Sequence, residues 1–386
     1  MTAFALDDDQ ARFVREVRET AAKELVPLVE RGEPGRVNRP LLAAMGEHGL
    51  LPRLFSPGGD AGAPARVRAM DLCLLRESLA AVSTEAETAL ALQGLGGYPI
   101  LLAGPEALVR QWIPAIAGGE KVAAFALSEP EAGSDAAALA LAAEPDDDGW
   151  RLSGEKVWIS NAPEADVYSV FARTTAGAGH RGITAFAVPA GRAGLTGEHL
   201  DMISPHPIGR LVFDGVRVTR DDLLGDVDRG FAVAMNTLNL FRPSVGAFAV
   251  GMAQAALDAT MRYTREREAF GGPLRDRQAV AHAIADMATR LEAARLLVYA
   301  AAAAYDRGAE RAEIARRSAM AKLFATETAQ YVVDTAVQLH GARALRRGHL
   351  LEHLYREVRA PRIYEGASEV QRDIIAAQLA REESHR

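Results

Sequence analysis

A carboxylate near the C-terminus is the first side chain whose setting suggests chemistry. Glu365 lies in the stretch RIYEGASEVQR, between Tyr364 and Gly366 and just before a helix predicted to begin near Ala367. One interpretation is structural, because a carboxylate at a helix N-terminus stabilises the helix by about 0.3–1 kcal/mol. The other is catalytic, because a carboxylate in a partly apolar site is a stronger base. The stretch alone favours the structural interpretation.

Two stretches in the middle of the chain combine strand patterning with polar side chains. In FALSEPEAGSD a predicted strand ends at Ser128, and a glycine lets the following loop approach another group closely. Taken alone, Ser134 in this loop favours a turn cap. In GEKVWISNAP, Trp158 and Ser160 are expected on one face of a strand, as part of the core or as a ring-stacking site with a hydroxyl beside it.

Composition and charge exclude several classes of function. The chain has 386 residues, 49% hydrophobic and 25% charged, and its net charge of −7 gives no general attraction to nucleic acid or anionic membranes. The single cysteine, Cys73, excludes an internal disulfide framework, and the nine histidines lack metal-ligand spacing. No glycine-rich strand-to-helix loop of the dinucleotide or Walker type occurs, so any nucleotide must be bound in another way.

Two features predict a cytoplasmic protein. Asp7, Asp8 and Asp9 lie where a secretory signal needs an apolar run. The longest apolar stretch, residues 296–305, covers about half a membrane span and is rich in alanine. We therefore expect no association with a membrane.

Three zones of different periodicity must position the polar residues. Residues 1–122 repeat apolar side chains at spacings of three and four, which predicts helices. In residues 123–224 the period is two, which predicts a compact antiparallel barrel or sandwich. Residues 225–386 return to helical spacing, with long helices expected over 231–265, 274–305 and 311–339. Alanine at many contact positions there is typical of a bundle with close helix approach.

Five motifs in a fixed order make the sequence specific. FALSEPEAGSD, SGEKVWISN, REREAFGGPLRDRQAV, AVQLHGARA and RIYEGASEVQR follow one another along the chain. With these motifs the sequence resembles the acyl-CoA dehydrogenase family over essentially its whole length. The resemblance implies an N-terminal helical domain (1–122), a middle antiparallel β-barrel (123–224) and a C-terminal four-helix bundle (225–386). It also implies a homodimer or homotetramer with FAD between the β-domain and the C-terminal helices.

The resemblance assigns the central chemistry to Glu365. Family members remove two hydrogens across the α,β bond of an acyl thioester. Glu365 is implied to take the α-proton while the β-hydrogen leaves as hydride to flavin N5. Tyr364 and Gly366 would keep its site partly apolar, and desolvation would raise the pKa of the carboxylate. Some relatives carry the base on the helix that here contains NLFRPSVG, where Phe241 cannot take a proton.

The resemblance also implies two groups of residues that contact FAD. One group, from the β-domain, would line the flavin or hydrogen-bond to its polar edge: Phe125, Leu127, Ser128, Ser134, Trp158 and Ser160. The other, from the C-terminal helices, would bind the dinucleotide: Gln338, Gly341 and, from the neighbouring subunit, Arg267, Phe270 and Gln278. Arg267 would meet the pyrophosphate, so the monomer is expected to bind flavin poorly.

The thioester substrate is implied to contact Ser134, Asn239, Arg242 and Gly366. Asn239 stands where the family usually has an aspartate that helps hold CoA, and Ser204 is a further candidate for the thioester arm. The missing charge predicts a weakly held CoA adenosine end. Together with other departures from the family pattern, such as Ala367 where a threonine is common, it predicts either an unusual acyl group or one bound to a carrier protein. Gly96, Gly97 and Tyr98 are expected near the acyl tail, where the glycines would leave width.

Several functions are compatible with these residues. The leading one is an FAD-dependent acyl-CoA (or acyl-carrier) dehydrogenase that passes electrons to an electron-transfer flavoprotein. An oxidase of the same fold would be reoxidised by oxygen. A flavin monooxygenase is disfavoured, because such an enzyme does not need Glu365. A catalytically silent binding protein on this scaffold would be colourless and would not take up FAD.

Overall fold

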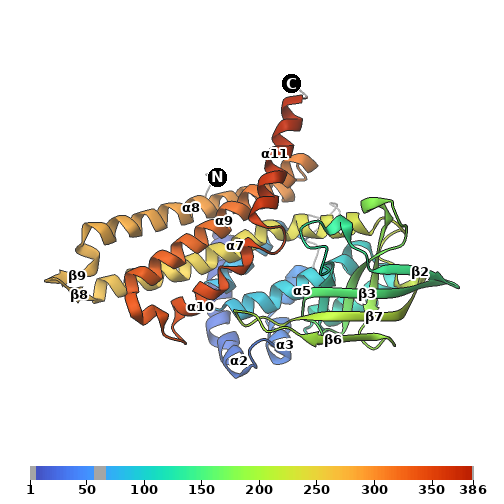
Figure 1. The fold of residues 1–386 in the computed structure, drawn as a ribbon. Helices are drawn as coiled ribbons and strands as arrows, with labels where there is room; N and C mark the ends of the chain where they lie inside the picture. The colour runs from blue at the N-terminus through green and yellow to red at the C-terminus, as the bar shows by residue number, and fades with distance from the viewer. Residues whose placement is uncertain (1–5, 56–66, 385–386) are drawn as a thin grey trace. The chain divides into compact units, whose positions relative to one another are not determined.

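The computed structural model describes residues 6–55 and 67–384 (Figure 1). Its contacts divide the chain into two compact units, each made of segments distant in sequence. Unit 1 comprises Met1–Lys23, Arg68–Glu87 and Asn239–Arg386, and unit 2 comprises Glu24–Val67 and Thr88–Leu238. Two helices, α5 (Thr84–Ala103) and α7 (Gly230–Glu266), contribute residues to both.

Unit 1 is built mainly from helices. Besides parts of α5 and α7 it contains α1 (Asp8–Thr20), α4 (Ala69–Ala80), α8 (Gln278–Asp306), α9 (Arg311–His340), α10 (Leu350–Glu357) and α11 (Ser368–Ser384). The three long helices predicted near the C-terminus correspond to α7, α8 and α9. A short hairpin of β8 (Glu268–Ala269) and β9 (Gly272–Pro273) joins α7 to α8.

Small residues bring the long helices of unit 1 close together. A Cβ on Gly246 of α7 would lie 2.7 Å from Cγ2 of Val298 in α8 and 3.4 Å from the carbonyl oxygen of Ala321 in α9. A Cβ on Gly251, one and a half turns later, would lie 2.5 Å from the carbonyl oxygen of Glu77 in α4. The predicted close approach of these helices is confirmed, and Figure 1 shows α7, α8 and α9 running side by side.

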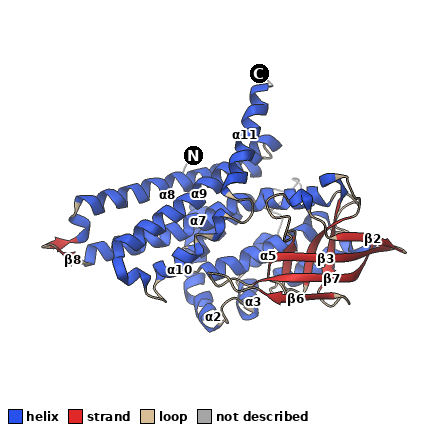
Figure 2. Ribbon diagram, viewed as in Figure 1, coloured by secondary structure: helices blue, strands red, loops and turns tan. Residues whose placement is uncertain are grey.

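Unit 2 combines helices with a seven-stranded sheet (Figure 2). Its strands are β1 (Ala123–Ala126), β2 (Ala142–Asp146), β3 (Gly149–Ser160), β4 (Val167–Arg173), β5 (Ile183–Pro189), β6 (Leu195–His199) and β7 (Ile208–Thr219). Their order is β1-β4-β2-β3-β7-β6, with β5 beside β4. The helices α2 (Val26–Arg31), α3 (Arg39–Glu47) and α6 (Glu106–Ala117) belong to the same unit.

The predicted antiparallel barrel is wrong in two respects, although the helical–β–helical order is confirmed. The sheet is a curled half-barrel, because its outer strands β5 and β6 are not paired with each other in the described part of the chain. It is also mixed, since β1 runs parallel to β4 from the pair Ala123–Val167 onwards. Alternating hydrophobicity identifies the buried face of a strand but not its neighbour in the sheet.

Helix α5 packs directly on the sheet of unit 2. A Cβ on Gly96 would lie 2.5 Å from the backbone of Ala123 in β1, and one on Gly97 would lie 2.8 Å from the ring of Phe55. The hydroxyl of Ser169 in β4 donates to the carbonyl of Gly96 at 2.8 Å. The two glycines therefore serve this packing, and the prediction that they leave width for an acyl tail is wrong.

Across residues 6–55 and 67–384, the helices are too short or too polar to cross a membrane.

Candidate active site

The turn that carries Glu365 has an unusual backbone. Glu365 has φ of 51° and Gly366 has φ of 96°, so both adopt the left-handed region just before α11 begins at Ser368. This region is costly for a residue with a Cβ, and such residues persist only where their surroundings hold them. The φ of 96° at Gly366 favours glycine, and a Cβ there would also lie 2.3 Å from Nε2 of Gln371, whose side chain would have to move.

Three side chains from different helices of unit 1 hold this turn by its carbonyl groups. Nε2 of Gln371 in α11 donates to the carbonyls of Glu365 (3.3 Å) and Gly366 (2.9 Å). Nζ of Lys322 in α9 donates to the Gly366 carbonyl at 2.6 Å, and Nε of Arg242 in α7 donates to the Glu365 carbonyl at 3.4 Å. The backbone is therefore fixed while the carboxylate of Glu365 takes no part in holding it.

One oxygen of the Glu365 carboxylate is buried, although the residue as a whole is half-buried. Its Oε2 is buried and has no hydrogen-bond partner in the described part of the chain. Burial raises the pKa of Glu365, and the nearby cations Arg76, Lys322 and Arg242 partly oppose that rise. The predicted direction of the shift is confirmed. The structural interpretation is disfavoured, because among the described residues this oxygen accepts no amide hydrogen at the start of α11.

Asn239 and Arg242 lie on one face of α7 beside this turn. Nη1 of Arg242 is 3.4 Å from Oδ1 of Asn239, and burial lowers the pKa of Arg242 while Glu365 opposes that shift. The structure thus brings together Asn239, Arg242, Glu365 and Gly366, four of the residues predicted for catalysis and substrate binding. Phe241 is buried.

In unit 2, the end of β1 is fastened to β3 by a buried ion pair. Nζ of Lys156 in β3 donates to Oε1 of Glu129 at 2.7 Å and to the carbonyl of Leu127 at 2.9 Å. The carbonyl of Ser128 accepts from the amide of Val157 at 3.1 Å. Burial lowers the pKa of Lys156 to about 8, against the effect of Glu129. The carbonyl of Leu127 therefore already accepts a hydrogen bond within the protein. The hydroxyl of Ser128, a half-buried residue, is the polar side-chain group that remains in this segment.

The side chain of Trp158 is exposed to solvent. The pairing of β3 with β7 is irregular between Lys156 and Ile159, and Trp158 within this irregularity has φ of 61°. Its side chain is 55% exposed, while Val157 and Ile159 on either side are buried. The alternative that Trp158 belongs to the core is wrong. A large ring held out of the core by a left-handed backbone is suited to stacking on a planar group.

Ser160 has a partner that sequence reasoning missed. Its Oγ lies 3.0 Å from Nε2 of His206, in the loop before β7. Burial lowers the pKa of His206 to about 4, so this imidazole is neutral at ordinary pH. The histidine in ISPHPIG could have indicated this contact. The residue that we predicted from that stretch was Ser204, which is buried. Of the other residues predicted in unit 2, Phe125 packs on Phe171 with ring centroids 4.9 Å apart, and Ser134 is exposed.

The remaining predicted cofactor residues of unit 1 are exposed near the ends of α7 and α9. Phe270, in the hairpin, has φ of 55° and is 86% exposed. Arg267 is exposed without a side-chain ion pair or hydrogen bond in the described part of the chain. Gln278 begins α8, while Gln338 and Gly341 end α9. The rings of Tyr263 in α7 and His340 in α9 stack at 4.2 Å, which ties the two helix ends together.

In unit 2, Trp158 offers an exposed ring and Ser160 a hydroxyl two residues on, which suit a planar group with a polar edge. In unit 1, Arg267 offers a cation with no ion pair in the described part of the chain, and Phe270 offers an exposed ring. Trp158, Phe270 and Glu365 are also three of the few non-glycine residues with positive φ. Each unit thus contains part of the predicted site.

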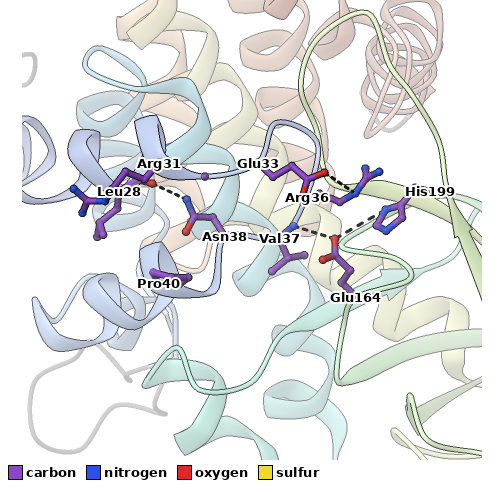
Figure 3. A pocket seen from close by; sticks show the side chains of 10 residues that line it. Leu28, Arg31, Glu33, Arg36, Val37, Asn38, Pro40, Glu164 and His199 are labelled. Atoms are coloured by element: carbon purple, nitrogen blue, oxygen red, sulfur yellow. Dashed lines mark hydrogen bonds and ion pairs between the residues drawn. The ribbon is translucent and has the colours of Figure 1, made fainter.

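A separate pocket of unit 2 contains none of the predicted residues (Figure 3). It has a volume of about 460 Å³ and is lined by residues such as Asn38, Glu164 and His199. Its polar groups are engaged with each other: Asn38 donates to the carbonyl of Leu28 at 2.9 Å, and Glu164 accepts from the amide of Val37 at 3.0 Å. Nothing in its lining resembles the chemistry of Glu365. The described residues also contain no cluster of three or more potential metal ligands.

Three family models match the chain in the order of its zones. The N-terminal domain of acyl-CoA dehydrogenase matches residues 7–120, the middle domain matches residues 124–216 and the C-terminal domain matches residues 228–380.

Individual relatives are similar over nearly the whole chain. The mitochondrial short-chain specific acyl-CoA dehydrogenase of Sus scrofa is 38% identical over 370 residues, which cover 94% of this chain and 88% of that protein. The structure of butyryl-CoA dehydrogenase from Megasphaera elsdenii matches with a TM-score of 0.88 and 33% identity, over 98% of this chain and 100% of that one. A glutaryl-CoA dehydrogenase from Mycobacterium smegmatis in complex with FADH2 matches with a TM-score of 0.86 and 26% identity, over 97% and 95%.

Proposed function

This chain belongs to the acyl-CoA dehydrogenase family, and on that premise we propose that it oxidises the α,β bond of an acyl thioester with FAD as cofactor. It is then an oxidoreductase acting on a carbon–carbon single bond. The observation that carries this proposal is the buried Oε2 of Glu365, which has no hydrogen-bond partner in the described part of the chain.

Glu365 acts as the general base that removes the α-proton. A buried carboxylate oxygen without a hydrogen-bond donor has a high affinity for a proton, and burial correspondingly raises the pKa of Glu365. Lys322, Gln371 and Arg242 hold the carbonyls of Glu365 and Gly366, so the turn is fixed by groups other than Oε2 of the base. The base is thus both oriented and reactive.

FAD, when bound, supplies the hydride acceptor. We assign stacking on its ring to Trp158 and hydrogen bonding at its polar edge to Ser128 and Ser160. The exposed indole of Trp158 and the neutral His206 beside Ser160 support this assignment. Other contacts with the ring and the dinucleotide are assigned to Phe125, Leu127, Ser134, Arg267, Phe270, Gln278, Gln338 and Gly341.

The thioester is assigned to Ser134, Asn239, Arg242 and Gly366. The hydrogen bond from Arg242 to the Glu365 carbonyl supports a role for this arginine in joining substrate binding to the position of the base. Asn239 faces Arg242 without a charge, which supports the proposal that the CoA adenosine end is weakly held and that a carrier-bound acyl group is accepted.

We further propose a homodimer or homotetramer that delivers electrons to an electron-transfer flavoprotein. Phe270, 86% exposed at the end of the α7–α8 hairpin, supports a contact with a second subunit there. The cytoplasmic location and the domain limits at 122 and 224 stay predictions from the sequence.

The decisive test is anaerobic bleaching of the bound flavin by a panel of straight, branched and cyclic acyl thioesters. Glu365→Gln keeps the volume of the side chain and removes the base, so we expect FAD to stay bound while the bleaching rate falls by about 10²–10⁴-fold. Retention of the wild-type rate in Glu365→Gln would falsify the role of Glu365. Return of the flavin band on exposure to air, faster than with an electron-transfer flavoprotein, would identify an oxidase instead.

A second test addresses the cofactor. Arg267→Ala removes a cation proposed to contact an anionic pyrophosphate, and we expect the FAD content of the purified protein to fall by more than its thermal stability. Arg265→Ala, two residues earlier in the same exposed region, is the matched control. Equal flavin content in wild type and Arg267→Ala would remove Arg267 from the cofactor site.

A further inference from the structure

Unit 1 contains a buried ion pair between α4 and α5. Arg76 in α4 and Glu87 in α5 are 3% and 1% exposed, and Nε of Arg76 donates to Oε1 of Glu87. Nη1 of Arg76 donates to the hydroxyl of Ser244 in α7 at 2.7 Å, and the guanidinium lies 5.9 Å from the ring centre of Phe248. Three helices therefore fix this cation.

The same turn of α7 connects Arg76 to the base. Ser244, which holds Arg76, follows Arg242 by two residues, and Nε of Arg242 contacts the carbonyl of Glu365. Arg76 is also the strongest of the three cations acting on the Glu365 carboxylate. A buried ion pair of this kind adds little stability over a well-packed apolar replacement, because both ions lose their hydration. Stability is thus a weak explanation for this cluster.

Resting on the function proposed above, we propose that Arg76, held by Glu87 and Ser244, is a positioning residue that keeps the carboxylate of Glu365 ionised and ready to accept the α-proton. Without a counter-charge, a buried carboxylate takes up a proton from solvent and ceases to be a base. Arg76 supplies that counter-charge while its own hydrogen bonds go to Glu87 and Ser244.

The three cations around Glu365 differ in how permanent their charge is. Burial alone would lower the pKa of Arg76, but Glu87, Glu365 and Tyr364 together raise it, so this charge persists at every relevant pH. Burial lowers the pKa of Lys322 to about 8, with Glu365, Glu327 and Glu369 opposing that shift and Arg242 adding to it. Arg242 donates to the carbonyl of Glu365, and burial lowers its pKa. Arg76 is therefore the fixed charge, and Lys322 is the one that titrates.

The test is the pH dependence of anaerobic flavin bleaching in a double-mutant cycle of the holoenzyme. Arg76→Met removes the cation, and we expect the acidic limb of the rate to move to higher pH by about 1–3 units, the size of an opposite-charge effect. Glu87→Gln leaves the cation in place and should not move the limb upward. Arg76→Met/Glu87→Gln leaves no uncompensated carboxylate, so it keeps the fold intact and should retain the upward shift.

The alternatives give different outcomes. If Arg76 only neutralises Glu87, the double variant will have the wild-type limb, and the inference is overturned. Arg76→Lys restores a cation and should return the limb towards the wild-type pH. The infrared band of the Glu365 carboxyl group, identified by its loss in Glu365→Gln, reports the same titration without turnover. If no thioester bleaches the wild-type flavin, the proposed function fails; if bleaching occurs and neither the limb nor this band moves, only the role of Arg76 fails.

Discussion

Each unit contains a carboxylate beside a buried lysine, and the two carboxylates have opposite surroundings. In unit 2, Oε1 of Glu129 accepts from Lys156 at 2.7 Å and from the amide of Leu141 at 2.9 Å, and Oε2 accepts from the amide of Ala140 at 2.6 Å. In unit 1, Oε2 of Glu365 has no partner in the described part of the chain, and Lys322 donates to the neighbouring carbonyl of Gly366 instead.

On the proposed function, this difference separates a structural carboxylate, Glu129, from a reactive one, Glu365. The burial of the neighbouring lysine does not distinguish the two carboxylates. Lys156 and Lys322 are both fully buried, and burial lowers the pKa of each to about 8. What differs is the acceptor that each lysine uses. A carboxylate that accepts several hydrogen bonds fastens the segments that donate them, whereas a buried carboxylate oxygen without a donor keeps its affinity for a proton.

The largest expected effect comes from the same substitution at both carboxylates. Glu365→Gln should abolish most flavin bleaching with a small effect on stability. Glu129→Gln should lower stability with a small effect on bleaching. It leaves the buried Lys156 without a counter-charge, at a cost of about 3–5 kcal/mol in the free energy of unfolding. The measurements are the bleaching rate per bound flavin and denaturant titrations of both variants. Loss of bleaching with normal stability in Glu129→Gln would contradict the comparison.

Matched substitutions of the two lysines should give smaller effects that differ in kind. Lys156→Met leaves Glu129 charged and buried and removes the donor to the Leu127 carbonyl, so it should lower the free energy of unfolding by several kcal/mol. Lys322→Met removes the donor to the Gly366 carbonyl, at about 1–3 kcal/mol. Because it also removes a cation near Glu365, it should move the acidic limb of bleaching to higher pH. Equal stability losses with unchanged pH profiles would show that the lysines have the same role.

The reactive carboxylate was predictable from sequence, but the groups that tune it were not. Glu365 and Trp158 lie in short motifs that become specific only in combination with the other three, in their fixed order. Arg76 and Glu87 lie more than 270 residues before Glu365, in helices whose apolar spacing predicts only that they are helical. They reach the base through the packing of α4 and α5 on α7, and a single sequence does not specify which helix faces meet.

The same limit explains the error in the sheet and the partial success at Trp158. Alternation predicted the strands of unit 2, but the parallel pairing of β1 with β4 depends on a return of the chain after the β2–β3 hairpin. The irregularity that turns Trp158 outward is likewise a property of the pairing between β3 and β7. Motif spacing located the ring, whereas pairing between strands determined its exposure.

The smallest expected effect is a gain in stability when Glu365 is made neutral. Because burial raises the pKa of Glu365, the folded protein binds this proton more tightly than the unfolded chain does. Ionised Glu365 therefore lowers the free energy of unfolding by the full amount above its folded pKa. The loss shrinks as the pH falls below that pKa and is gone below the pKa of the unfolded chain. Glu365→Gln, neutral at every pH, should be more stable than wild type at pH 7 by about 1.4 kcal/mol for each unit of the shift. Urea titrations of the holoenzyme should show the gain shrinking as the pH is lowered, and a Glu365→Gln variant less stable than wild type at neutral pH would mean that the carboxylate is satisfied as Glu129 is.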